Sequence, residues 1–208
     1  MKQIKLLTIA VLLIASTSHA QINKGVNALG GNLSFGTSSI KNGNNSFTNT
    51  SLLISPSFMT AYKNNRAVGF NLSYQYSKSN YANQKTNGYG TGVFLRQYKP
   101  LGKGFYVFAQ EALNFQYSKI SPDTTNFINS KTISIAFTAN PGIAYDLSKK
   151  VQLELLLFNN FLSAEYSYLS STSIASSTIK SNNFHIGANL DGSQLTSLNI
   201  GAKIFFGR

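Results

Sequence analysis

The feature that most constrains this fold is an alternation of apolar with small or polar residues over segments of about ten residues. In residues 68–77, Val, Phe, Leu, Tyr and Tyr alternate with Gly, Asn, Ser, Gln and Ser. The same pattern recurs in 132–140 and again in 197–206, at the end of the chain. Because successive side chains of a strand point to opposite faces, each segment is predicted to be a strand with one apolar and one polar face.

Eight such strands are predicted, at residues 26–36, 51–62, 67–77, 89–99, 105–117, 132–145, 151–162 and 195–206. Most reach the ~9–11 residues that a tilted strand needs to cross a bilayer, whereas soluble strands average about 5–6. The connections alternate: those at 63–66, 100–104 and 146–150 are short, and those at 37–50, 78–88, 118–131 and 163–194 are long and polar. This rhythm predicts an all-β fold, an eight-stranded antiparallel up-and-down transmembrane β-barrel with short periplasmic turns and long extracellular loops.

Aromatic residues gather at both ends of these strands, where a barrel has its girdles at the water–lipid boundaries. Near the short turns lie Tyr62, Tyr98, Phe105, Tyr145 and Phe206. Near the long connections lie Tyr74, Tyr76, Tyr89, Tyr117, Tyr166 and Tyr168. The apolar faces are therefore expected to meet lipid.

Residues 1–20 are predicted to be a signal peptide, followed by the barrel domain at 21–208. Lys2 and Lys5 precede an apolar run at 4–15, and His19-Ala20 completes a small-x-small cleavage pattern. A retained transmembrane helix is the alternative, but the run is shorter than the ~20 residues that such a helix needs. Export with a strand-only membrane domain predicts the outer membrane of a Gram-negative bacterium.

Composition narrows the function classes. The formal net charge is +12, but the 18 Lys and Arg residues are scattered singly, so nucleic acid is not an expected partner. The chain has no cysteine and no clustered histidines or paired carboxylates, so we expect neither a metal nor another cofactor.

The bore of an eight-stranded barrel is filled by side chains. The predicted inward face is polar: Gly69, Asn71, Ser73, Gln75, Gln110, Asn114, Gln116, Ser134, Thr138, Asn140, Asn199 and Gly201. Arg96, Glu154 and Lys203 share this parity, and a charge taken out of water needs a partner. We therefore predict a charge network in the lumen in which Glu154 pairs with Arg96 or Lys203; it is either a structural staple or an ion gate.

Three residues do not fit the simple pattern. Glu111 shares the parity of the lipid-facing residues of 105–117, so the sequence predicts either a bulge near 109–112 that turns it inward or a reversed parity in the first half of that strand. Pro56 and Pro141 each lie a few residues before a short turn, where a bulge or weakened pairing is expected.

Several segments together resemble the small outer-membrane β-barrel domain family often called "porin family" in Bacteroidota-type bacteria, with an architecture like OmpA and OmpX. They are 54–62 leading through 63–66 to 67–70, the stretches 92–101 and 141–145, and the closing strand 198–206. Gln97 departs from the aromatic run that the family favours. Gly207 and Arg208 follow Phe206, where such barrels usually end on an aromatic residue read by the insertion machinery. The resemblance implies a location, a fold and the barrel-assembly machinery as a partner during insertion, but no single activity.

Four functions are weighed. The first is a non-enzymatic surface barrel, which supports the envelope or binds through its loops; basic loop residues would then hold phosphates of outer-membrane lipid and lipopolysaccharide. The second is a narrow pore for small solutes. The third is a lipid-modifying outer-membrane enzyme using His185, with Glu165 nearby in sequence. The fourth is a soluble lipocalin-type carrier, which the absence of Trp disfavours.

Three further points stay open. Asp123-Thr124-Thr125 resembles an O-glycosylation acceptor motif, with Thr124 as the acceptor. Residues 184–190 fit either an extension of the eighth strand or a separate loop hairpin. The oligomeric state is not predicted.

Overall fold

A computed structural model describes residues 21–42, 45–80, 84–122, 129–157, 161–172, 178–188 and 198–207. The signal peptide predicted at 1–20 lies outside these residues. The strands are β1 (Asn27–Asn42), β2 (Asn45–Lys63), β3 (Arg66–Ser79), β4 (Gln84–Gly102), β5 (Phe105–Pro122), β6 (Asn129–Asp146), β7 (Val151–Leu156), β8 (Leu162–Thr172), β9 (Thr178–Ala188) and β10 (Leu198–Phe206). No helix in the described part of the chain is both long and apolar enough to cross a membrane.

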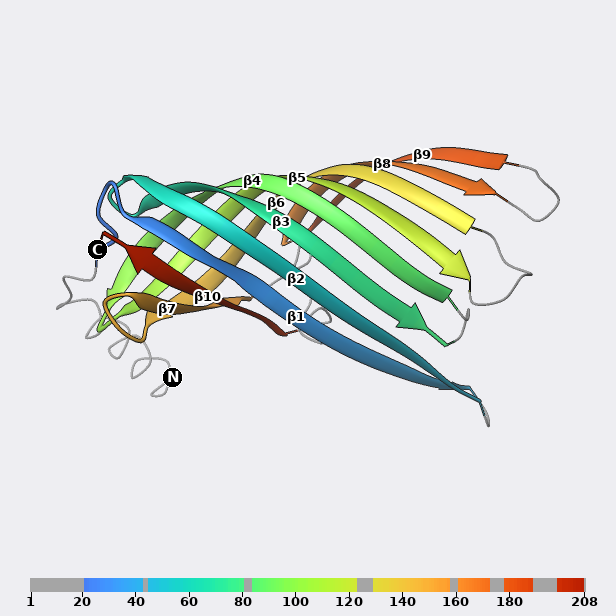
Figure 1. The fold of residues 1–208 in the computed structure, drawn as a ribbon, viewed down its shortest axis with the longest axis horizontal. Coiled ribbons are helices and arrows are strands. Elements are labelled where there is room, and N and C mark those ends of the chain that lie inside the picture. The colour runs from blue at the N-terminus through green and yellow to red at the C-terminus, as the bar shows by residue number, and fades with distance from the viewer. Residues whose placement is uncertain are drawn as a thin grey trace, which may run out of the picture.

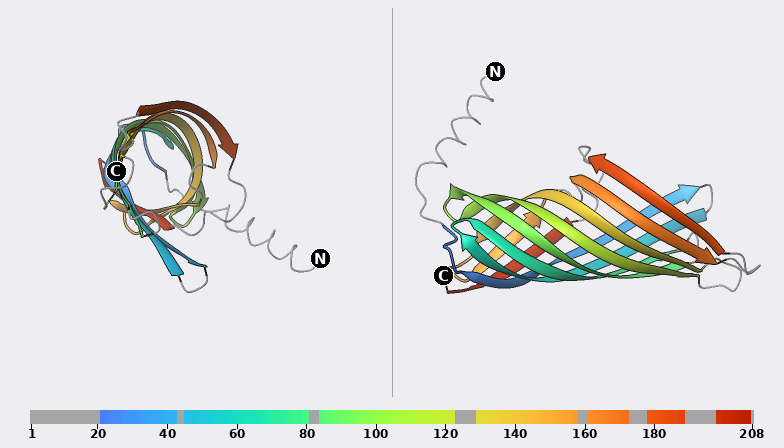
Figure 2. Two further views of the ribbon diagram at one scale, coloured as in Figure 1. Left: turned by 90° about the vertical axis from the view of Figure 1, so that its right-hand side faces the viewer. Right: turned by 90° about the horizontal axis from the view of Figure 1, so that it is seen from above.

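Eight strands form a closed ring (Figures 1 and 2). The order is β5-β4-β3-β2-β1-β10-β7-β6, and pairing of β5 with β6 completes the circle. All pairings are antiparallel, and the last strand, β10, pairs with the first, β1. The predicted fold class is therefore confirmed. We call the rim that carries the connections β2–β3, β4–β5 and β6–β7 the turn end, and the opposite rim the loop end.

The seventh predicted strand is interrupted and then continues. β6 pairs with β7 over Gly142–Asp146 and with β8 over Asn129–Ala139. β8 then pairs with β9 along its whole length. The prediction of a long loop at 163–194 was thus wrong for most of its length. Residues 184–188 belong to β9, a strand separate from β10, and residues 189 and 190 lie outside the described residues.

The other strands also run further toward the loop end than predicted. β1 reaches Asn42, β2 begins at Asn45 and β5 continues to Pro122. Most of the loops predicted at 37–50, 78–88 and 118–131 is therefore strand. The outer face of a strand beyond the membrane contacts water, so it needs no apolar residues. The Ser, Thr and Asn side chains of these segments are therefore compatible with strands as well as with turns.

Among the described residues, the ring is complete at the turn end and open between β1 and β10 at the loop end. β10 pairs with β1 from Asn27 to Phe35, and beyond Phe35 the described part of β1 pairs with β2 alone. Viewed from the loop end, the β1–β2 hairpin leans away from the ring (Figure 2).

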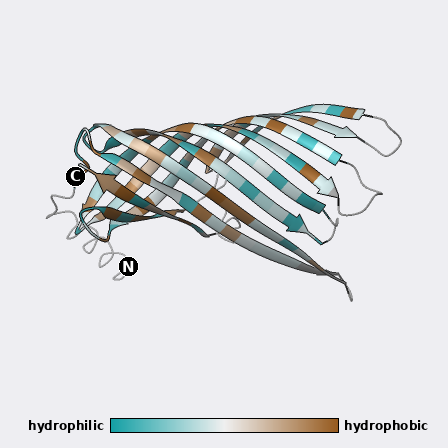
Figure 3. Cartoon of the chain, viewed as in Figure 1, coloured by the Kyte–Doolittle hydropathy of each residue, from teal (hydrophilic) through white to brown (hydrophobic). Residues whose placement is uncertain are grey.

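The outer face is apolar and the alternation along the strands is visible in Figure 3. Leu33, Phe70 and Phe115 each expose about half of their surface although they are large and apolar. A soluble protein buries such residues, so a continuous exposed belt of them indicates contact with lipid.

The two prolines lie where strand pairing weakens. The register between β2 and β3 lapses at Ser55 and Pro56, which confirms the weakened pairing predicted there. The carbonyl of Pro141 accepts a hydrogen bond from Leu157 N. In a strand the nitrogen and the carbonyl of one residue point to the same neighbour, so the Pro141 nitrogen also points toward the end of β7, where pairing stops. Neither proline therefore breaks a continuous ladder.

Candidate functional site

The lumen contains a buried ionic cluster made by three strands that lie far apart in the sequence. Arg96 on β4, Glu154 on β7 and Lys203 on β10 are each at most 3% exposed. Arg96 Nη1 lies 2.5 Å from Glu154 Oε1, and Lys203 Nζ lies 3.3 Å from Glu154 Oε2. The second contact is an ion pair without hydrogen-bond alignment, because Glu154 Oε2 has no hydrogen-bond partner. One carboxylate thus lies between two cations.

Arg96 is held by more than the carboxylate. Its guanidinium donates to the side-chain oxygen of Gln110 and, at 3.0 Å, to Tyr98 Oη. The ring of Phe108 lies 4.3 Å from the guanidinium carbon, a cation–π distance. These contacts hold the buried arginine side chain in the lumen.

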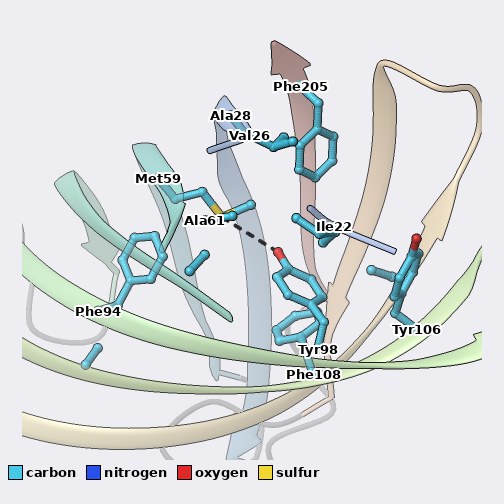
Figure 4. Close-up of a cluster of buried hydrophobic side chains, with 13 residues drawn as sticks. Ile22, Val26, Ala28, Met59, Ala61, Phe94, Tyr98, Tyr106, Phe108 and Phe205 are labelled. Carbon is cyan, nitrogen blue, oxygen red and sulfur yellow. Dashed lines mark hydrogen bonds between the residues drawn. The ribbon is translucent and has the colours of Figure 1, made fainter. Parts of the chain in front are cut away.

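A layer of buried apolar side chains lies against this ionic cluster, most of it toward the turn end (Figure 4). Its large members include Met59, Phe94, Tyr98, Tyr106, Phe108 and Phe205, all at most 5% exposed. Ile22, ahead of β1, is 1% exposed and joins this cluster; its backbone N–H donates to Asn65 Oδ1 at 3.0 Å. The chain ahead of β1 therefore helps to close the turn end.

This layer corrects two predictions. The inward face was expected to be polar throughout, but it is polar only toward the loop end. Tyr98 was placed in the outer aromatic girdle, yet it lies inside, because it shares the parity of Arg96 two residues earlier. That shared parity was the signal that could have identified it. The predicted girdle residues Tyr62, Phe105, Tyr145 and Phe206 are exposed on the outside.

Above the ionic cluster the lumen holds a cavity of about 240 Å³. Most of the described residues that line it carry hydroxyl or carboxamide groups, and Glu165 of β8 is the charged residue among them: Leu53, Ser55, Asn71, Ser73, Gln75, Thr91, Asn114, Phe115, Gln116, Ser134, Ala136, Thr138, Ser163 and Glu165. The ionic cluster lies between this space and the turn end, so among the described residues the space has a floor, and we call it the cup.

Outside the barrel, a row of aromatic residues marks the loop-end boundary of the apolar belt. Four tyrosines stand in register across neighbouring strands, with Ile133 of β6 between the last two: Tyr74, Tyr89, Tyr117 and Tyr168. We call these four residues the tyrosine row. The rings of Tyr74 and Tyr89 lie 5.4 Å apart. These residues form the expected outer girdle.

Two residues further toward the loop end, the same outward face becomes basic. Lys119 on β5 lies directly opposite Lys131 on β6, and Ser170 separates Lys131 from Lys180 on β9. We call Lys119, Lys131 and Lys180 the lysine row. All three are exposed, and none lies within 4.0 Å of a carboxylate of the described residues. A second like-charged pair, Lys78 opposite Lys85, joins β3 and β4.

The remaining predicted sites fall in different places. Thr124 lies outside the described residues. His185 on β9 stands opposite Glu165 on β8 and is exposed. Glu111 on β5 stands between Leu95 and Ala139 in an unbroken register, so the bulge and the reversed parity predicted for it were wrong. Its side chain shares the outward face.

Known proteins offer likeness in fold but not in sequence. No family model matches the chain, and no curated protein matches it. Neisserial surface protein A is 14% identical over 90% of this chain and 100% of its own, with a TM-score of 0.45. OprG of Pseudomonas aeruginosa is 13% identical over 89% of this chain and 98% of its own, with a TM-score of 0.49. A major outer membrane protein of Thermus thermophilus is 10% identical over 86% of this chain and 99% of its own, with a TM-score of 0.43.

This chain is similar in fold to small outer-membrane β-barrels. That conclusion rests on its own closed ring of eight antiparallel strands and on the apolar belt around it. The resemblance predicted from the sequence is confirmed at the level of fold, and the likenesses describe fold alone.

Proposed function

We propose that this chain is a non-enzymatic barrel in the outer membrane of a Gram-negative bacterium, and that its lysine row binds the phosphates of lipopolysaccharide. The observation that carries the proposal is the pair Lys119 and Lys131, which face each other across β5 and β6 next to the tyrosine row. Like charges directly opposite on a sheet destabilise it. An anion between the two ammonium groups removes this repulsion.

The position of the pair supports a lipid rather than a soluble anion. Tyr117 precedes Lys119 by two residues on the same face, so the ammonium groups stand just beyond the ring that marks the lipid boundary. Headgroup phosphates lie at this depth. Lys180 extends the row to β9, so three strands present cations to the surrounding leaflet.

Replacing Lys119 and Lys131 by Gln together should weaken binding of bis-phosphorylated lipid A by roughly 30-fold, because each lysine near an anionic surface contributes about 1 kcal/mol. Native mass spectrometry of the detergent-folded protein titrated with lipid A measures this change. The matched control is Lys149→Gln with Lys150→Gln, two exposed lysines at the turn end. Equal loss in both variants, or equal binding of dephosphorylated lipid A, would contradict the proposal.

A single Lys119→Gln change should affect barrel stability in opposite directions without and with phosphate lipid. In a neutral detergent without phosphate lipid it removes repulsion and should raise barrel stability by about 0.2–1 kcal/mol. With lipid A present it removes a ligand and should lower the stabilisation that the lipid gives. Thermal unfolding followed by circular dichroism, with and without lipid A, measures both signs. A change of the same sign in both media would argue against phosphate binding.

A narrow pore is the alternative, and the buried side chains that pack inside the barrel count against it. An ion crossing the barrel would have to pass the Arg96–Glu154–Lys203 cluster and then the apolar layer that includes Ile22. Planar-bilayer recordings of the purified barrel should therefore show no steady open-channel current. Reproducible single-channel steps that scale with salt concentration would favour the pore instead.

A further inference from the structure

Glu111 stands in the middle of the lipid-facing belt. On β5 it lies midway between Phe105 at the turn-end boundary and Tyr117 at the loop-end boundary. Its register partners are Leu95 on β4 and Ala139 on β6, both on the outward face. It is the one acidic residue of the described chain that faces outward, since Asp146, Glu154 and Glu165 face the lumen.

The structure gives this carboxylate no partner inside its own chain. Among the described residues Glu111 has neither a salt bridge nor a side-chain hydrogen bond. An acidic group facing hydrocarbon is costly and marks a functional site until a partner for it is found. Its position calls for a hydrogen-bond donor supplied from outside the barrel.

The same face carries such a donor. Gln97 on β4 is exposed, faces outward and lies opposite Ala109, so it is the diagonal neighbour of Glu111. No hydrogen bond joins the two side chains in the structure. Between and beside them stand Ala109 and Ala139, where the surrounding belt has Leu, Phe and Ile. Small residues allow two membrane proteins to approach closely.

We propose that this face is a homodimer interface within the membrane, on which a second copy of the chain packs. In a two-fold interface the same patch occurs on both copies, so a donor on one meets an acceptor on the other, and the reverse. The carboxamide N–H of Gln97 donates to Glu111 of the second copy, and the second copy returns the same bond. The donor and the acceptor on this face are therefore complementary to those of a second copy.

Disulfide cross-linking in native membranes tests the proposal, because the chain has no cysteine. Ala109→Cys should give a covalent dimer on oxidation. Ala202→Cys, also outward and exposed but on β10, should give at least tenfold less. Equal cross-linking at both positions, no dimer at Ala109→Cys, or an adduct with a different protein would overturn the proposal.

Exchange of the two polar residues separates the hydrogen bond from a merely structural effect. In the Ala109→Cys background, Gln97→Glu places carboxylates against carboxylates and should lower the dimer fraction at least tenfold. The double variant Gln97→Glu with Glu111→Gln restores one donor and one acceptor and should recover the dimer. Heat-modifiable gel migration shows that each variant is folded. Failure of the double variant to recover while folded would overturn the pairing, whatever the outcome for lipid binding.

Discussion

Replacing Glu154 by Gln should lower the free energy of unfolding by about 3–5 kcal/mol, because it leaves two buried cations without a counter-charge. Arg96 and Lys203 are each 1% exposed and both face this carboxylate, so neither can reach water without disrupting the lumen. Urea titration of the barrel in lipid vesicles, read as the fraction that migrates in folded form without boiling, measures the loss.

The matched control removes all three charges together. Arg96→Met, Glu154→Leu and Lys203→Met in one chain should recover most of the stability, because well-packed apolar side chains replace buried ion pairs at little net cost. A Glu154→Gln protein within about 1 kcal/mol of the parent would show that the cluster is not a staple.

Replacing Tyr106 by Ala should cost about 3–5 kcal/mol of stability, because it empties a fully buried aromatic site in the apolar layer. The Tyr106 ring meets that of Tyr98 edge-on at 6.0 Å, and its hydroxyl donates to Asp146 Oδ2 at 3.0 Å. The same urea titration measures the loss.

Two controls separate the contribution of the Tyr106 ring from that of its hydroxyl and from that of an outward tyrosine. Tyr106→Phe keeps the ring and loses the hydroxyl, and should cost only about 1 kcal/mol. Tyr145→Ala removes a neighbouring tyrosine that faces outward and is 38% exposed, and should cost less than Tyr106→Ala. If the two alanine variants lose equal stability, the inner layer does not hold the turn end together.

The proposed lipid binding and the proposed dimer both use the outer surface of the barrel. The cup above the ionic cluster has a closed floor, whereas the lysine row and the Glu111 face both meet the membrane. Lipid binding and dimer formation use different residues at different depths, so each can be removed by substitution while the other is kept.

The alternation of residues was enough to predict the strand faces, and with them the class of fold. Period-two alternation is local: once Val68, Phe70 and Leu72 face lipid, Gly69 and Asn71 must face the lumen. The same rule placed Arg96, Glu154 and Lys203 inside. Strand lengths were underestimated because polar strand ends in water carry no alternation that distinguishes them from loops.

Which side chains come into contact depends on how the strands close into a ring. Arg96, Glu154 and Lys203 lie on three strands that ring closure and strand register bring to one level. No single segment of the sequence contains the information on closure or on register. The apolar plug at the turn end likewise required Ile22, from outside the strands, to fold onto Tyr98 and its neighbours. For Glu111, parity allowed an inward turn through a bulge, and the unbroken pairing with β4 and β6 ruled it out, because a continuous ladder fixes the side that each residue faces.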